Sequence, residues 1–144
     1  MNTAKDISAK TDTPSLQEEH GLSLLGAYEL TKPRLSLLSV FTAALGFLVH
    51  DPLRSDYSLF LCLALGTALS AAGAAALNQW IERKEDALMA RTANRPIPAN
   101  LVSPEFALAF GMALSALGLS VLWLGTNPWA MFLTLLTLLI YLLV

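Results

Sequence analysis

The chain has 144 residues, of which 55% are hydrophobic and 14% charged, and its mean hydropathy is +0.56. This composition is typical of an integral membrane protein. The net charge of −2 argues against a nucleic acid as partner, and the single cysteine, Cys62, excludes an intrachain disulfide and a cysteine-cluster metal site.

The first thirty residues are more polar than the rest. Residues 1–20 are rich in threonine, serine, lysine and acidic residues, and we expect them to form a disordered tail. They lack both the apolar core of a secretory signal and the arginine-rich, acid-poor character of a mitochondrial transit peptide, which favours a bacterial origin. Residues 21–30 carry enough leucine to predict a short helix lying in the membrane interface.

Four apolar segments follow, at about 33–49, 57–80, 104–125 and 128–144. A transmembrane helix needs roughly 20 residues, with about 17 as the practical minimum, so all four qualify if the first and last include their flanks. Ser103-Pro104 and Asn127-Pro128 each place a capping side chain before a proline, as at a helix start. The predicted fold class is therefore an all-α integral membrane protein with four transmembrane helices.

The second apolar segment has a face of small residues. Gly66, Ser70, Gly73 and the alanines 74–76 are small enough to let a neighbouring helix approach closely. Ser70 and Ala74 lie within about 80° of Asn78 around the helix axis, so the face that carries Asn78 continues as a packing face. The polar residues that follow should thus point into the helix bundle.

The basic residues predict the orientation in the membrane. Only Arg54 lies between the first and second spans. Six other basic residues flank the first span or lie between the second and third spans: Lys32, Arg34, Arg83, Lys84, Arg91 and Arg95. The positive-inside rule then places the N-terminus and residues 78–98 in the cytoplasm.

Residues 78–98 contain the strongest chemical signal. Asn78, Glu82 and Asp86 recur every four residues, so on a helix they fall within an arc of roughly 80° and along about 12 Å of its axis. Such a ladder of oxygen ligands suits Mg²⁺ shared with substrate phosphates, and the nearby arginines and Lys84 suit an anionic ligand. The alternative is a set of charged residues that merely faces the headgroup region.

Two segments carry a resemblance to a known family. Asn78, Glu82 and Asp86, together with the run from Arg91 to Pro98, resemble the first aspartate-rich motif of the protoheme IX farnesyltransferases. These enzymes belong to the intramembrane prenyltransferase superfamily. The segment from Leu30 to Leu35, LTKPRL, looks like the opening motif of the same family. The resemblance covers about 28–144 and implies the N-terminal part of a bundle of roughly nine helices.

What the resemblance implies is the transfer of a farnesyl group from farnesyl diphosphate to a vinyl group of protoheme IX, giving heme O, in a bacterial inner (plasma) membrane. It assigns Asn78, Glu82 and Asp86 to Mg²⁺ and diphosphate binding. The basic residues expected to contact diphosphate or to close the loop over it are Arg91, Arg95, Lys32, Arg34 and Lys84. The lipid bilayer, and heme A synthase or terminal oxidase assembly factors, are the further partners implied.

Two departures from the family pattern qualify this reading. Lys84 stands where many members have an acidic residue. The family's second aspartate-rich motif lies in its C-terminal half, so we expect this chain to lack turnover of its own. Two other functions stay open: a prenyltransferase acting on a quinone or chlorophyll-type acceptor, and a non-catalytic membrane protein that assembles with a partner through its small-residue face.

Overall fold

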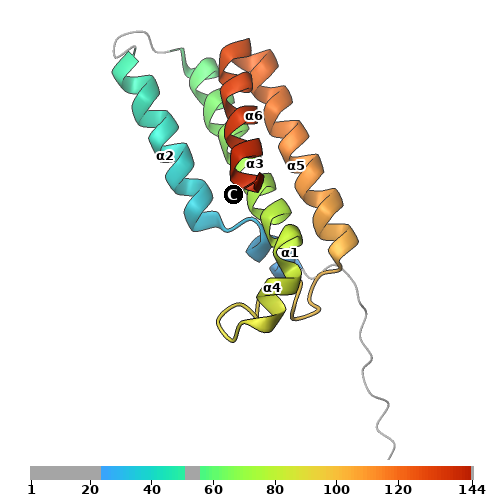
Figure 1. Ribbon diagram of the computed structural model, residues 1–144. Coiled ribbons are helices and arrows are strands. Elements are labelled where there is room, and N and C mark those ends of the chain that lie inside the picture. Colours follow the sequence, from blue (N-terminus) through green and yellow to red (C-terminus); the bar gives the residue numbers. More distant parts are fainter. Residues whose placement is uncertain (1–23, 51–55, 144) are drawn as a thin grey trace, which may run out of the picture.

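The computed structural model describes residues 24–50 and 56–143, and the predicted N-terminal tail lies outside these residues. The described residues form helices connected by turns, without a strand. The elements, shown in Figure 1, are α1 (Leu24–Leu30), α2 (Pro33–His50), α3 (Tyr57–Ile81), α4 (Arg83–Leu88), α5 (Pro104–Gly125) and α6 (Pro128–Leu143). The all-helical fold class predicted from the sequence is confirmed.

The four predicted apolar segments correspond to α2, α3, α5 and α6. Three of these helices, α2, α3 and α5, are long and apolar enough to cross a membrane. The fourth, α6, has 16 described residues, which gives about 24 Å of helix against a hydrocarbon core of about 30 Å. The structure therefore supports three of the four predicted spans by length and composition.

The helix starts follow the predicted capping signals. The Ser103 side chain accepts a hydrogen bond from the Phe106 amide at 3.2 Å, and Asn127 Oδ1 accepts one from the Ala130 amide at 2.8 Å. Asp56 caps α3 in the same way through the Leu59 amide, at 3.3 Å. Each cap satisfies a backbone donor that the first turn of a helix leaves unpaired.

The α3–α5 pair forms the centre of the bundle, and small residues let the two backbones approach closely. A Cβ atom added to Gly73 would lie 2.6 Å from the Ser115 amide nitrogen and 2.8 Å from the Gly111 carbonyl oxygen. A Cβ atom added to Gly118 would lie 2.6 Å from the Ser70 amide nitrogen and 2.8 Å from the Gly66 carbonyl oxygen. The predicted packing face of α3 is thus confirmed, and its partner is α5.

The two helices contribute the same motif to this interface. The residues Gly66, Ser70, Gly73 and Leu77 of α3 have the same spacing as Gly111, Ser115, Gly118 and Leu122 of α5. The helices run antiparallel, and each glycine faces a residue with a side chain: Gly66 faces Leu122, Gly118 faces Ser70, Gly73 faces Ser115 and Gly111 faces Leu77. The contacts are therefore related by a local two-fold symmetry, with van der Waals packing as their main source of stability.

The outer faces of the bundle are apolar. α2 has no buried residue, and large side chains such as Leu38, Phe41 and Leu45 are more than 45% exposed. α6 likewise exposes Leu133, and a soluble monomer rarely leaves so much contiguous apolar surface in water. These faces suit contact with lipid or with further membrane helices, as the membrane composition requires.

The orientation of these helices is a prediction that reporter fusions can check. A reporter fused after Pro98 should be active in the cytoplasm, and one fused after Asp56 should be active on the opposite side, because six of the seven bases considered flank the Pro98 side. A periplasmic signal from the Pro98 fusion, with a cytoplasmic one from the Asp56 fusion, would reverse the orientation.

Candidate functional site

The polar residues after α3 continue its helical path. Only Glu82 separates α3 from α4. Its amide donates to the Asn78 carbonyl oxygen at 2.9 Å, and the Asp86 amide donates to the Glu82 carbonyl oxygen at 2.8 Å. Because this four-residue hydrogen bonding is unbroken, Asn78, Glu82 and Asp86 keep their helical spacing and lie one turn apart. Figure 1 shows α4, which continues from α3, at one end of the bundle.

Arg95 joins the two acidic residues of this ladder. Its Nη1 atom donates to Glu82 Oε2 at 3.1 Å and forms an ion pair with Asp86 Oδ2. The Asp86 side chain is 4% exposed, whereas those of Arg95 and Glu82 are 27% and 45% exposed. Burial of the guanidinium lowers the pKa of Arg95, but the hydrogen bonds to Asp86 and Glu82 outweigh it and raise this pKa. Both carboxylates therefore converge on one point of positive charge.

The loop that follows α4 holds Arg95 in place. The buried Thr92 side chain donates to the Asp86 carbonyl oxygen at 2.9 Å, and the Arg95 amide donates to the Thr92 carbonyl oxygen at 3.0 Å. Ile97 and Val102 of the same loop are buried against Leu30 in the apolar core. The sequence alone predicts no role for Thr92. The available signal was its position between Arg91 and Arg95, in the segment that resembles the family motif.

Glu82 and Asp86, with Arg95 between them, form an acidic cluster. Lys32 approaches this acidic cluster from another part of the chain. It lies in the turn between α1 and α2, with a left-handed backbone at φ 42°, and it is half-buried. Burial lowers its pKa, and so does the positive charge of Arg95, whereas the carboxylates of Glu82 and Asp86 act in the opposite direction. The structure thus brings together four of the predicted residues, two acidic and two basic.

The other predicted residues do not join the ion pairs of this cluster. Asn78 lies one turn above Glu82 and is half-buried. Arg34, Lys84 and Arg91 are exposed. Arg83 lies over the Trp80 ring, with 4.5 Å from its guanidinium carbon to the ring centroid. Trp80 also packs against the apolar core.

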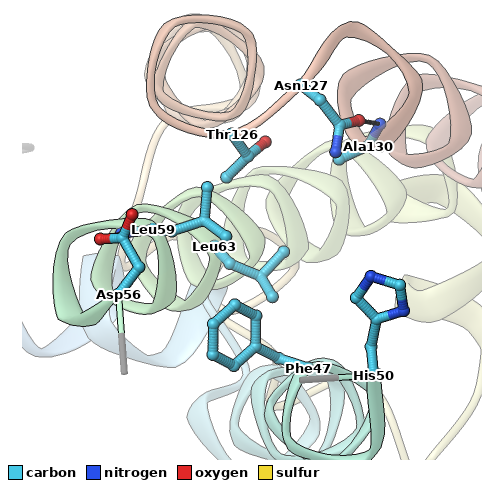
Figure 2. A pocket seen from close by; sticks show the side chains of 8 residues that line it. All are labelled: Phe47, His50, Asp56, Leu59, Leu63, Thr126, Asn127 and Ala130. Carbon is cyan, nitrogen blue, oxygen red and sulfur yellow. Dashed lines mark hydrogen bonds between the residues drawn. The ribbon is translucent and has the colours of Figure 1, made fainter. Parts of the chain in front are cut away.

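A cavity of about 600 Å³ lies at the opposite end of the bundle, where α2, α3 and the α5–α6 connection meet (Figure 2). Three of its polar side chains serve as helix caps or bond to their own helix: Asp56, Thr126 and Asn127. α3 has 25 residues and is therefore about 37 Å long. The cavity lies near its first residues and the acidic cluster beyond its last ones. The predicted site residues that the structure brings together thus lie far from this cavity.

The chain is similar to known proteins over most of its length. The UbiA prenyltransferase family matches residues 39–144. The chain is 48% identical over 114 residues to a protoheme IX farnesyltransferase of Opitutus terrae, which covers 79% of this chain and 38% of the relative. It is 45% identical over 130 residues to one of Acidiphilium cryptum, with coverage of 83% and 38%, and 46% identical over 112 residues to one of Rhizobium rhizogenes, with 76% and 35%.

The chain spans less than two fifths of the length of these curated relatives. No solved structure matches it significantly. The family match nevertheless extends over α3, α4, the loop that carries Arg95, and α5, and so includes most of the acidic cluster. This chain belongs to the UbiA prenyltransferase family.

Proposed function

We propose that the chain forms the diphosphate-binding part of a protoheme IX farnesyltransferase, which transfers a farnesyl group from farnesyl diphosphate to a vinyl group of protoheme IX and gives heme O. The observation that carries this proposal is the convergence of Glu82 and Asp86 on Arg95, with Lys32 beside them, at the polar end of a membrane-spanning helix. The similarity to enzymes named for that reaction supports the choice of substrates.

The donor atoms of the ladder fit Mg²⁺. Glu82 and Asp86 both reach one atom of Arg95, so their carboxylates can share a single cation. Within the part of the chain that the structure describes, no group of three or more histidine, cysteine or acidic side chains gathers. A site with only two carboxylates suits Mg²⁺, because this ion commonly keeps waters and takes further ligands from substrate phosphates. Asn78, Glu82 and Asp86 would hold the ion, and bound Mg²⁺ supplies Lewis-acid neutralisation of the leaving diphosphate.

The chain's own residues would bind and orient the diphosphate. Arg95 offers a planar donor group that suits phosphate oxygens, and Lys32 adds a second positive charge from the α1–α2 turn. Arg91 precedes the loop residues that hold Arg95, while Arg34 and Lys84 are exposed nearby and would attract the anion from solution. The apolar helices would accommodate the isoprenoid tail and exclude water, which otherwise captures an allylic cation.

The same proposal places the protein in a bacterial inner membrane with its N-terminus and the acidic cluster in the cytoplasm. The supporting observations are the three membrane-length helices and the distribution of basic residues. Heme A synthase and terminal oxidase assembly factors are proposed as partners, since they would act after heme O is made.

A chimera tests the reaction. Residues 1–144 are joined to the part of the Opitutus terrae relative that this chain does not match, and the membrane fraction is incubated with protoheme IX, farnesyl diphosphate and Mg²⁺. We expect farnesylated heme by mass spectrometry, as for the intact relative. A chimera that inserts and folds but makes no heme O would contradict the proposal.

The acceptor is tested in parallel with 4-hydroxybenzoate, a quinone precursor. We expect no prenylated benzoate, because the segments around Lys32 and from Arg91 to Pro98 resemble the heme enzymes. If prenylated benzoate formed in place of heme O, the chain would be part of a prenyltransferase that acts on quinone precursors.

A further inference from the structure

Gln79 is the most enclosed polar side chain near the acidic cluster. It is 2% exposed and lies in α3 between Asn78 and Trp80. Its Nε2 atom donates to the Leu30 carbonyl oxygen at 3.1 Å and lies 3.5 Å from the Glu29 carbonyl oxygen. These are the last two carbonyls of α1, which a helix end leaves without intrahelical donors. Gln79 therefore ties the end of α1 to α3.

The turn tied in this way leads directly to Lys32. One residue, Thr31, separates Leu30 from Lys32, and the backbone of Lys32 is left-handed, a conformation that is unfavourable for a non-glycine residue. Such a conformation persists when surrounding contacts determine it. Here the Thr31 amide donates to the Tyr28 carbonyl oxygen at 3.2 Å, and the Lys32 amide donates to the Glu29 carbonyl oxygen at 3.3 Å. The carbonyl of Glu29 is thus shared by the turn and by Gln79.

The same helix connects Gln79 to the acidic cluster. Gln79 precedes Glu82 by three residues, so one helical turn fixes the distance between the anchor of the α1–α2 turn and the first carboxylate. Gly26 adds a second close contact, since a Cβ atom there would lie 2.5 Å from Val102 Cγ2 in the loop that follows Arg95. α1 is therefore set against both segments that build the cluster.

We propose that Gln79 is a positioning residue: by holding the Leu30 and Glu29 carbonyls, it sets the Lys32 ammonium beside Glu82, Asp86 and Arg95, where Lys32 contacts the diphosphate. The contact with diphosphate rests on the proposed function. The placement of Lys32 does not, so the two parts can be tested separately.

The first experiment measures the placement of Lys32 without any ligand. The 144-residue chain in nanodiscs is treated with acetic anhydride at one pH, and acetylation of Lys32 is measured by mass spectrometry against an added free amine. In Gln79→Leu the acetylation rate of Lys32 should rise about fivefold, because the turn loses a hydrogen bond of about 1 kcal/mol that keeps the side chain half-buried. An unchanged rate in a folded variant overturns the proposal.

Two further variants control for folding and for burial. Ser70→Ala removes a different buried polar group of α3, a hydroxyl whose oxygen has no hydrogen-bond partner among the described residues, and it should leave the acetylation rate of Lys32 unchanged. Gln79→Met fills the same space with an unbranched side chain without a donor and should behave like Gln79→Leu. Far-UV circular dichroism verifies the helices, and unfolding of both Gln79 variants would indicate a purely structural role and overturn the proposal.

The second experiment measures the coupling between Gln79 and Lys32 in ligand binding. The affinity for inorganic pyrophosphate with Mg²⁺ is measured by calorimetry in the wild type, Gln79→Leu, Lys32→Met and the double variant. Gln79→Leu should weaken pyrophosphate binding about fivefold when Lys32 is present, and hardly at all when Lys32 is replaced by Met. Losses that multiply independently would show that Gln79 does not act through Lys32. If the wild type binds no pyrophosphate, the proposed function fails, and acetylation alone decides the placement.

Discussion

Gly73→Val is expected to separate α3 from α5 and to destabilise the bundle by about 3 kcal/mol, the upper end of the range for overpacking. The added side chain would meet backbone atoms, the Ser115 nitrogen at 2.6 Å and the Gly111 oxygen at 2.8 Å, and these atoms cannot rotate away. The helices would have to move apart and lose van der Waals contact along their length. Unfolding in detergent mixtures with increasing dodecyl sulfate, followed by circular dichroism, measures the loss.

Gly46→Val is the matched control for this change. Gly46 lies in α2, another apolar helix, and a Cβ atom there would have nothing within 4 Å. The same substitution at this position should have little effect. Because the interface has a local two-fold symmetry, Gly118→Val should destabilise the protein as much as Gly73→Val does. Equal stability of the Gly46 and Gly73 variants would contradict the close packing of α3 on α5.

Asp86→Asn is expected to weaken Mg²⁺-dependent pyrophosphate binding by at least about tenfold, roughly 1.4 kcal/mol. The substitution removes a buried carboxylate that lies with Glu82 around one point of positive charge, and it leaves Arg95 with a single acidic partner. In the chimera with the Opitutus terrae relative, turnover should fall by a similar factor, since the leaving diphosphate would lose the proposed metal anchor. Calorimetry and product analysis measure the two effects.

Glu85→Gln provides the control with the same change of charge. Glu85 precedes Asp86 in α4 but is exposed, and it lies outside the ion pairs of Arg95. Its neutralisation should change pyrophosphate binding less than about twofold, within the effect of a screened surface charge. If the Glu85 and Asp86 variants weaken binding equally, general electrostatic attraction explains the result and the assigned metal role would be wrong. Glu82→Ala, by contrast, should resemble Asp86→Asn.

Local signals allowed most of the fold to be predicted. Apolar length located α2, α3, α5 and α6 to within a residue or two, because a membrane requires long uninterrupted helices. Proline after a capping residue located the starts of α5 and α6. The repeated motif of α3 and α5 is present in the sequence but does not stand out there, since its two copies lie 45 positions apart, as Gly66 and Gly111 show.

The cluster was predictable in part. The spacing of Asn78, Glu82 and Asp86 depends on one helix, so the sequence predicted it directly. The ion pairs of Arg95 depend on how the loop from Met89 to Ser103 folds back, which local rules do not determine. Gln79 gave no signal at all, because a glutamine beside Asn78 looks like one more polar residue at a helix end, and only the packing of α1 shows what it binds.

The alternation of glycines with larger residues between α3 and α5 also determines how high each helix sits across the bilayer. If α5 slid along α3 by one turn, Ser70 would meet Leu122 and Leu77 would meet Ser115, and no glycine would receive either leucine. The observed alignment is therefore the one in which each leucine lies against a glycine of the other helix. Since Glu82 and Asp86 continue from α3 and the loop bearing Arg95 runs into α5, this alignment keeps the carboxylates and their guanidinium partner level at the same membrane surface.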